Sequence, residues 1–375
     1  TQQPGRYRSI SREHRQVEEE GQLVEQEVEL PELEWRFALV DDYRPDPKLM
    51  DRLVVTLSQT DARDGAIGGG KGPNLGELQH VPGIELPDEL KNAAEQEHIT
   101  PTIDIPDGFI VTAKAFRLFL EANLELQQFI QDQVEELRRH KGREDYKTAL
   151  KAISDRIRAS IRDPKWVMPG ELRTQIEQAY VRLSARVGTR DVAVAVRSSA
   201  TAEDMAAASF AGLYDTHLNR QGMDDVLAHI RMDWSSLFNW EAVDYRENHG
   251  IVQLSVAMAV IVQQMVESQW AGVGFSVEPV GGYTEASAVA ISFGLGESVV
   301  RGDVTPSYWV ITPENKLLAR KAGDKPTQIR FTHTGGAGTT KEPVPEDERF
   351  RFAVSRLKAW EIGLKTQAVG EYYGR

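Results

Sequence analysis

The chain of 375 residues contains no cysteine. It therefore forms no disulfide, holds no metal through thiolates and uses no thiol as a nucleophile. Long apolar runs are also missing, because the most apolar stretch, residues 256–262, is far shorter than the ~18 residues that predict a membrane span. No basic segment followed by an apolar one opens the sequence, so we expect a cytoplasmic protein with no membrane partner.

Positive charge is in short supply. The chain has 44 lysines and arginines against 57 aspartates and glutamates, which gives a net charge of −13. A nucleic-acid-binding surface spread over the molecule would need positive potential, so we expect no nucleic-acid partner. A local basic pocket for a nucleotide is compatible with this charge. The hydrophobic content of 41% and the length are typical of a globular protein with two or three domains or subdomains.

The order of patterns along the chain predicts an α+β fold. Residues 1–34 are strongly charged and predict an extended or partly disordered arm, followed by strands at 34–40 and 51–57. Apolar residues at helical spacing predict a helical bundle within residues 113–185. Five further strands and a final helix are predicted at residues 192–200, 256–266, 271–279, 286–294, 306–312 and about 345–373.

A glycine-rich run, GAIGGGKG, occupies residues 65–72. From Gly65 to Lys71 it satisfies the P-loop spacing, but the next residue is Gly72, where a P-loop has a Ser or Thr hydroxyl for Mg²⁺. Lys71 is therefore either a nucleotide-binding lysine in another architecture or a charged residue in a glycine-rich turn.

A second basic candidate is Arg197 in the segment AVRSSATAED, residues 195–204. An apolar strand brings this arginine to its end, and a guanidinium donates paired hydrogen bonds to phosphate. The alternative is an ion pair with Glu203 or Asp204. The hydroxyl residues that follow Arg197 could equally cap a helix: Ser198, Ser199 and Thr201.

Two more stretches could carry chemistry. Small residues around Phe210 and Gly212 could form a loop whose amides close over phosphates. The run SFGLGESVVRGDVTP, residues 292–306, begins like a dinucleotide fingerprint but lacks its third glycine. The carboxylates near these strand ends could be metal ligands or turn residues: Glu278, Glu297 and Asp303.

Five segments in one order strongly resemble a known family: GGKGPNLGEL, IPDGFIVTAKAF, VAVRSSATAEDMAAASFAGLYDTHLN, VIVQQMVESQWAGVGFSVEP and ISFGLGESVVRGDVTPSYWVI. They are similar to the N-terminal ATP-binding domain of phosphoenolpyruvate synthase (pyruvate, water dikinase) and pyruvate phosphate dikinase, which rifampicin phosphotransferase shares. The resemblance covers about residues 65–375.

The resemblance implies an ATP-grasp-type, two-lobed nucleotide-binding domain with a helical insert in the first lobe. Lys71 and Arg197 correspond to the family's phosphate-binding cations, and they are the residues expected to act in catalysis. Other expected nucleotide contacts are a small loop, an inter-lobe hinge and a residue near the triphosphate: Ser209, Phe210, Ala211 and Gly212; Gln264, Met265, Val266 and Glu267; and Glu297. The domains expected are an arm with the first strands at 1–62, a first lobe at 63–262 with its insert at about 113–185, and a second lobe at 263–375.

The activity implied is a phosphotransfer with paired acceptors. The β-phosphate of ATP passes to a histidine on a swivelling domain and then to pyruvate on a barrel domain, while water or phosphate takes the γ-phosphate. Both partner domains, and the family's Mg²⁺ ligands, are expected beyond Arg375, so we expect no metal ligands in residues 1–375 and no complete turnover by them. The alternatives are the nucleotide domain of a rifampicin-type antibiotic phosphotransferase and a free-standing, non-catalytic nucleotide-sensing module.

Overall fold

The computed structural model describes residues 12–19, 22–29, 47–81, 83–84, 95, 99–201, 214–279, 281, 283, 285–332 and 337–374. The chain divides into two units, residues 1–44 and residues 45–373, which are described separately. Helices and sheets are both extensive in the second unit, which confirms the α+β class. The strand predicted at 34–40 lies outside the described residues.

In the first unit the described residues form one hairpin. Strand β1 (Arg12–Glu19) pairs antiparallel with β2 (Gln22–Glu29), from Arg12 opposite Glu29 to Glu19 opposite Gln22. The sequence predicted an extended arm here and not this pairing. The two strands contain few apolar residues, so their alternation gives only a weak strand signal.

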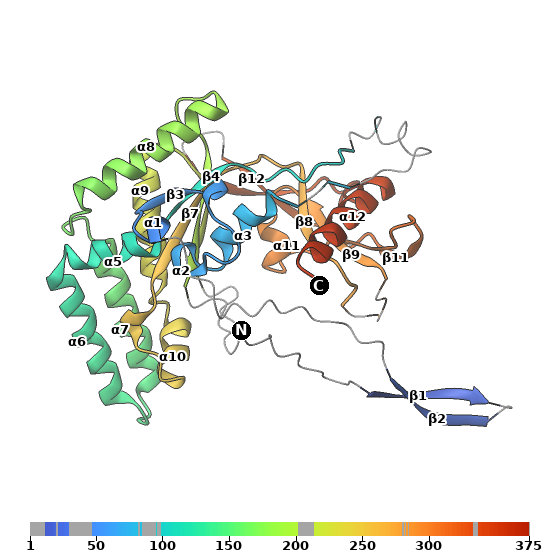
Figure 1. Ribbon diagram of the computed structural model, residues 1–375, viewed down its shortest axis with the longest axis horizontal. Helices are drawn as coiled ribbons and strands as arrows, with labels where there is room; N and C mark the ends of the chain where they lie inside the picture. The colour runs from blue at the N-terminus through green and yellow to red at the C-terminus, as the bar shows by residue number, and fades with distance from the viewer. Residues whose placement is uncertain are drawn as a thin grey trace, which may run out of the picture. The chain divides into compact units, whose positions relative to one another are not determined.

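A five-stranded antiparallel sheet forms the centre of one part of the second unit, here called the first lobe (Figure 1). Its strands, in spatial order, are β3 (Val54–Thr56), β4 (Gly108–Val111), β7 (Met258–Gln264), β5 (Val194–Ala200) and β6 (Thr216–Arg220). The central strand β7 is buried along almost its whole length, as expected for an apolar run covered on both faces. Because β3 pairs with β4, the segment around residue 55 belongs to this sheet; the division of the chain at 62 and 262 stays a prediction.

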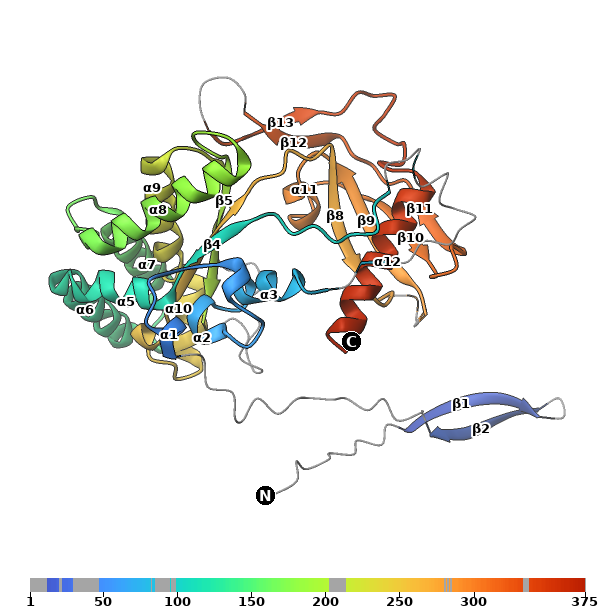
Figure 2. The ribbon, with the colours of Figure 1, turned by 45° about the horizontal axis from the view of Figure 1, so that its top comes forward.

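Helices cover one face of the sheet. They are α5 (Ala113–Glu121), α6 (Leu124–His140), α7 (Tyr146–Arg162), α8 (Gly170–Val187), α9 (Met223–Ser236) and α10 (Trp240–Asn248). Helices α5, α8 and α9 contact strands directly, and α6, α7 and α10 pack outside them (Figures 1 and 2). Their apolar stripes and alternate strand residues share one core, in which Phe119 stacks on Trp234 with ring centroids 5.1 Å apart.

The opposite face of the sheet carries short elements from the beginning of the second unit. They are α1 (Pro47–Met50), the 3₁₀ turn η2 (Leu57–Gln59), α2 (Gly65–Gly68) and α3 (Lys71–Leu78). A second, smaller core forms here, in which Ile67 packs with Ile110 and Ile261. Another 3₁₀ turn, η4 (Gln253–Ser255), precedes β7.

The second lobe is built on a four-stranded antiparallel sheet with the order β11, β10, β9, β8. Its elements are β8 (Trp270–Phe275), β9 (Ser287–Phe293), α11 (Glu297–Val300), β10 (Ser307–Ile311), β11 (Leu317–Lys321) and α12 (Arg356–Tyr372). Helix α12 packs on this sheet around Trp309 and Trp360. The helix begins at Arg356, later than the predicted residue 345. The Ser355 hydroxyl caps it by accepting a hydrogen bond from the Lys358 N–H at 3.1 Å.

A separate two-stranded hairpin, β12 (Thr327–Phe331) with β13 (Thr339–Pro343), lies between β11 and α12 in the sequence. Figure 2 shows it beside the second lobe's sheet and near the beginning of β5 in the first lobe. Local sequence gives little signal for these two strands, because they are short and largely polar.

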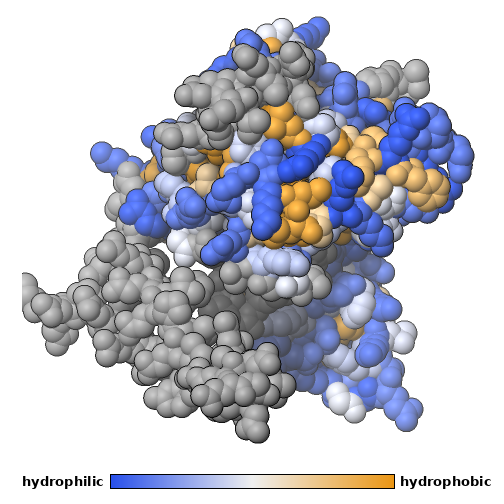
Figure 3. All heavy atoms as spheres, turned by 90° about the vertical axis from the view of Figure 1, so that its right-hand side faces the viewer, coloured by the Kyte–Doolittle hydropathy of each residue, from blue (hydrophilic) through white to orange (hydrophobic). Residues whose placement is uncertain are grey.

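None of the described helices is both long and apolar enough to cross a membrane. Figure 3 shows one face of the molecule, on which apolar patches alternate with charged side chains.

Candidate functional site

The side chains of strand β5 alternate between the two faces of the sheet, which have different surroundings. Successive residues of a strand point to opposite faces of the sheet. Val194, Val196 and Ala200 belong to the core beneath the helices, so Arg197 and Ser199 lie on the other face, which carries α2 and α3. Strand parity therefore brings the predicted phosphate arginine to the face that bears the glycine loop.

Arg197 is half-buried and held by a neighbouring strand. Its Nη1 donates to Oε1 of Gln263 on β7 at 3.4 Å, and Gln263 Nε2 donates to the Pro106 carbonyl at 3.0 Å. A guanidinium that is fixed in this way keeps its fork oriented before an anion arrives, which reduces the ordering cost of binding.

Lys71 is the first residue of α3, and it lies at the end of β5. Its backbone N–H donates to Ser199 Oγ at 3.1 Å, and the Gly72 N–H donates to the same oxygen at 3.3 Å. The Lys71 ammonium donates to the Ser198 carbonyl at 3.4 Å, one residue from Arg197. The Lys71 ammonium therefore contacts the strand that carries Arg197, the other cation that the sequence predicted.

The loop requires glycine because its backbone lies too close to neighbouring protein atoms to leave room for a side chain. At Gly69, φ is +67°, and a Cβ there would lie 2.2 Å from the Ser199 carbonyl oxygen. A Cβ at Gly72 would lie 2.8 Å from Ile110 Cδ1, and one at Gly76 would lie 2.2 Å from the Thr60 carbonyl oxygen. These glycines let the loop pack against the sheet, and that packing places Lys71.

The predicted hinge leaves β7 at its end. The Gln264 N–H donates to the Asp107 carbonyl at 2.8 Å, and the Met265 N–H donates to the Ala193 carbonyl at 2.9 Å. The side chains of Val266 and Glu267 are exposed. The hinge backbone is thus bound to the beginning of β5, at the end opposite Lys71.

A cavity of about 620 Å³ opens beside this hinge. It is lined by residues of the first lobe, the hinge and the β12–β13 hairpin: Asp191, Ala193, Asn219, Gln221, Gly222, Glu267, Phe331, Thr332 and Ala337. Asp191 and Ala193 lie just before β5, at the end of the strand opposite Lys71. Glu267 is the one lining residue that the sequence analysis predicted for the nucleotide.

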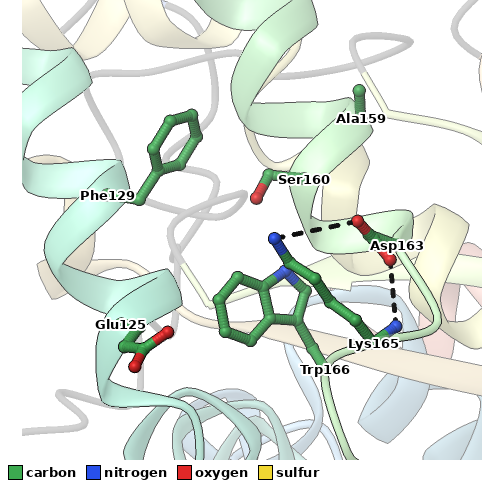
Figure 4. Close-up of a pocket in the computed structure, with 7 residues that line it drawn as sticks. All are labelled: Glu125, Phe129, Ala159, Ser160, Asp163, Lys165 and Trp166. Atoms are coloured by element: carbon green, nitrogen blue, oxygen red, sulfur yellow. Dashed lines mark hydrogen bonds and ion pairs between the residues drawn. The ribbon is translucent and has the colours of Figure 1, made fainter.

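A second cavity, of about 470 Å³, lies in the helical insert between α6 and the end of α7 (Figure 4). Lys165 occupies its edge, with the ammonium 4.5 Å from the Trp166 ring centroid and 3.9 Å from Asp163 Oδ2. None of the predicted site residues lines it. This cavity holds one cation that is already engaged, so it does not offer the paired cations that a triphosphate requires.

Two of the three candidate carboxylates in the second lobe, Glu278 and Asp303, have structural partners. Glu278 is 5% exposed; its Oε1 accepts from the Tyr308 hydroxyl at 2.9 Å and its Oε2 accepts from the Gly281 N–H. Burial and then this hydrogen bond raise the pKa of Tyr308 to about 12. Asp303 lies 3.7 Å from the Lys341 ammonium, and Glu297 begins α11. Glu278 is therefore best explained as a turn residue.

Among the residues that the structure describes, no three histidines, aspartates or glutamates lie close enough together to hold a metal ion. The predicted small loop lies outside the described residues: Ser209, Phe210, Ala211 and Gly212. The alternative partners of Arg197, Glu203 and Asp204, also fall there.

A buried acid lies on the helical side of the same sheet. Asp233 of α9 is fully buried, with Oδ1 3.3 Å from Nε2 of His217 on β6. Burial raises the pKa of Asp233 well above 3.8, and the charge of Asp215 adds to this, while the Lys71 charge opposes it. Burial also lowers the pKa of His217 to about 4. Burial therefore disfavours both charged forms at this contact, the carboxylate of Asp233 and the imidazolium of His217.

Comparison with known proteins shows the family of the chain. Residues 66–375 match the family described as pyruvate phosphate dikinase, AMP/ATP-binding domain. The chain belongs to this family.

Relatives of this dikinase-family chain include phosphoenolpyruvate synthases. A probable phosphoenolpyruvate synthase of Methanothermobacter thermautotrophicus is 36% identical over 326 residues, which cover 87% of this chain and 43% of the relative. The phosphoenolpyruvate synthase of Deinococcus radiodurans is 33% identical over 334 residues, covering 87% of this chain and 38% of the relative. Rifampicin phosphotransferase of Streptomyces sviceus is 36% identical over 321 residues, covering 85% and 33%. The chain thus spans less than half the length of these relatives.

Proposed function

We propose that the chain is the ATP-binding module of a phosphoenolpyruvate synthase-like dikinase and that it holds the nucleotide between its lobes in an ATP-grasp arrangement. One observation carries the proposal: the Lys71 ammonium contacts the Ser198 carbonyl, beside Arg197, at one end of a strand whose other end borders the hinge cavity. From Ala193 to Ser199 a strand rises about 20 Å. The base would lie in the hinge cavity and the phosphates would run along β5 toward Lys71.

In this arrangement Lys71 and Arg197 would bind and orient the phosphates. Lysine supplies a compact point charge, and arginine supplies a planar fork whose donors match phosphate oxygens. Positive groups that are fixed before the reaction stabilise charge that spreads over a transferring phosphoryl group, and positioning supplies much of the rate. The hinge residues Gln264, Met265, Val266 and Glu267 would meet the base, and Glu297 and the loop at Ser209–Gly212 would lie near the phosphates.

The rest of the reaction belongs to the whole protein. We infer that a histidine on a swivelling domain receives the β-phosphate of ATP and carries it to pyruvate on a barrel domain, while water or phosphate takes the γ-phosphate. Mg²⁺ would assist by neutralising charge on the phosphates. Tested in isolation, residues 1–375 should bind ATP but form no phosphoenolpyruvate from pyruvate. We expect the whole protein to act in the cytoplasm.

A second candidate is the nucleotide domain of an antibiotic phosphotransferase, and one observation favours keeping it. The rifampicin phosphotransferase relative is as similar in sequence as the synthases are. The acceptor distinguishes the two: the full-length protein should consume ATP with pyruvate under the first proposal and with rifampicin under the second. If neither pyruvate nor rifampicin supports the consumption of ATP, a nucleotide-sensing module is favoured.

Calorimetric titration with ATP tests the nucleotide assignment. Each of Lys71→Ala and Arg197→Ala removes a charged hydrogen-bond donor and should raise the dissociation constant by roughly 10- to 150-fold. Lys114→Ala and Arg117→Ala are matched controls from α5, and they should bind ATP as the wild type does. Unchanged affinity in both site variants, with an intact circular dichroism spectrum, would show that the phosphate assignment is wrong.

A further inference from the structure

The β12–β13 hairpin contacts the second lobe through the start of the GLGE segment. Gly294 and Ile329 form a parallel β-bridge, and the Leu295 N–H donates to the Ile329 carbonyl at 2.8 Å. Gly294 has φ of +74°, and a Cβ there would lie 2.3 Å from the Ile329 oxygen. The glycine therefore allows β12 to lie directly against the end of β9.

The same hairpin contacts the first lobe through Asn219, at the end of β6. Asn219 Nδ2 donates to the Gly338 carbonyl at 2.6 Å, and the Gly338 N–H donates to the Asn219 carbonyl at 2.8 Å. Asn219 is 5% exposed and has φ of +51°, a left-handed conformation that is uncommon for residues other than glycine and is enriched in asparagine. Hydrogen bonds from the hairpin to both the backbone and the side chain of Asn219 thus hold it in this strained conformation.

Gly338 fits this contact because it lacks a side chain. Its φ is +125°, and a Cβ there would lie 2.7 Å from Arg220 Nη2. The two-way hydrogen bond between Asn219 and Gly338, here called the hairpin latch, therefore depends on both residue types.

The hairpin latch forms part of the wall of the hinge cavity. Asn219 and Gln221 line the cavity from the first lobe, and Phe331, Thr332 and Ala337 line it from the hairpin. Ala337 is adjacent to Gly338, so breaking the latch would release the hairpin's side of the wall from the first lobe.

We propose that Asn219 is a positioning residue for the nucleotide base: by holding Gly338 it fixes the wall that carries Phe331 and Thr332. This rests on the proposed function, since the base must lie in the hinge cavity. A flat ligand with apolar faces and polar edges, such as a purine, suits a cavity whose lining includes Phe331 from the hairpin and Asp191 and Gln221 from the first lobe. The latch acts at the base end of the site, away from Lys71 and Arg197.

The test compares ATP with inorganic tripolyphosphate by calorimetry on the full chain. Asn219→Asp keeps the size and tolerates the left-handed conformation, but it replaces the donating amide with a carboxylate oxygen that faces the Gly338 carbonyl. Asn219→Gly keeps the conformation and removes the donor. Both variants should weaken ATP binding by roughly tenfold, because a buried carbonyl loses its donor, and should leave tripolyphosphate binding unchanged.

A matched control is available in the second lobe. Asn315 also has a positive φ, of +60°, in the turn between β10 and β11. Asn315→Asp and Asn315→Gly should bind both ligands as the wild type does. An equal loss of ATP and tripolyphosphate affinity in the Asn219 variants, or no loss of either, would overturn the proposal.

Hydrogen exchange in the ligand-free protein separates the latch from the proposed function. The Gly338 amide should exchange slowly in the wild type and at least tenfold faster in Asn219→Asp, since the latch must open for exchange. If the wild type binds neither ligand, the proposed function fails, while the exchange result still decides whether the latch exists. Equal exchange rates in wild type and variant would overturn the latch.

Discussion

At the scale of single residues, Asp233 and His217 show how burial sets charge. Both lie on the helical side of the sheet, opposite the face that carries Arg197. Burial disfavours the charged form of each, so the pKa of the acid rises and that of the imidazole falls to about 4. A neutral pair can remain under the sheet near the Lys71 charge without the desolvation cost of two ions.

The substitution Asp233→Asn should change the pH dependence of stability. The folded protein retains the Asp233 proton above pH 3.8, where the unfolded chain loses it, so the free energy of unfolding of the wild type falls as pH rises from 3.8 toward the raised pKa. Asparagine cannot ionise. The stability of the variant relative to wild type should therefore increase between pH 5 and pH 7, by up to about 1.4 kcal/mol per pH unit. Urea denaturation at pH 5, 6 and 7 measures this difference.

The control for this prediction is on the same helix. Asp224 is 95% exposed, and Asp224→Asn makes the same substitution at a solvated position, so its difference from wild type is the baseline at each pH. A difference for Asp233→Asn that stays constant with pH would mean that Asp233 is ionised in the folded protein.

Sequence reasoning identified Lys71 and Arg197 but not Asn219 or Asp233. The first two lie in motifs whose residue types suit phosphate, so local sequence carries their signal. Asn219 acquires its role from a contact with Gly338, 119 positions away, and from a positive φ that no local pattern predicts. Asp233 looks like any acidic residue of a helix until its burial is known.

At the scale of elements, α3 depends on glycine for its place on the sheet. Its first residue binds Ser199, and Gly69, just before the helix, lies against the carbonyl of the same serine. Any side chain at Gly69 would push the helix, and with it Lys71, away from β5.

Gly69→Ala should destabilise the protein by about 1–3 kcal/mol, because alanine is strained at this φ and its methyl group overlaps the Ser199 carbonyl. The same shift should weaken ATP binding through Lys71. Thermal denaturation and calorimetry measure the two effects on one preparation.

Gly65→Ala is the matched control. It lies in α2, and a Cβ there would meet nothing within 4 Å. Alanine has a higher helix propensity than glycine, so the stability of this variant should be unchanged or increased by up to about 1 kcal/mol. Equal stability of the two variants would contradict the packing role assigned to Gly69.

The elements differ in how far sequence could predict them. Helical spacing marked the insert over residues 113–185, and the structure has helices α5 to α8 there. Helix α9 was not identified, although Val226, Ile230 and Trp234 have helical spacing. Strands β12 and β13 have five residues each and few apolar positions, so their pairing could not be predicted from alternation.

At the scale of the whole molecule, the two lobes have separate hydrophobic cores. Among the described residues, the first-lobe core includes six helices and the sheet, whereas the core around Trp309 and Trp360 is much smaller. Burial of apolar surface is the main source of stability, so the lobes should differ in their resistance to unfolding.

Hydrogen exchange at increasing urea should show β9 and β10 opening at lower urea than β5 and β7. ATP that binds between the lobes should reduce this difference, and at 100 times its dissociation constant it should add about 2.7 kcal/mol to the free energy of unfolding. Simultaneous opening of both sheets without ATP would show instead that the lobes form one cooperative unit.

The α+β class followed from the order of helical and alternating patterns, but the strand order did not. Strand β4 pairs with β7, and Ile110 opposite Ile261 joins positions about 150 residues apart, across the whole helical insert. Such pairings depend on packing between distant segments, and periodicity within one segment does not encode them.

The packing of the glycine loop has an evolutionary consequence. Gly69 and Gly76 meet protein atoms of Ser199 and Thr60, so replacing them damages the fold whether or not a nucleotide binds. Lys71 has no comparable role in packing. A relative that had lost its activity would therefore be under selection to keep the glycines while its lysine drifted, and loss of this lysine behind an intact glycine run would identify such a pseudoenzyme from its gene.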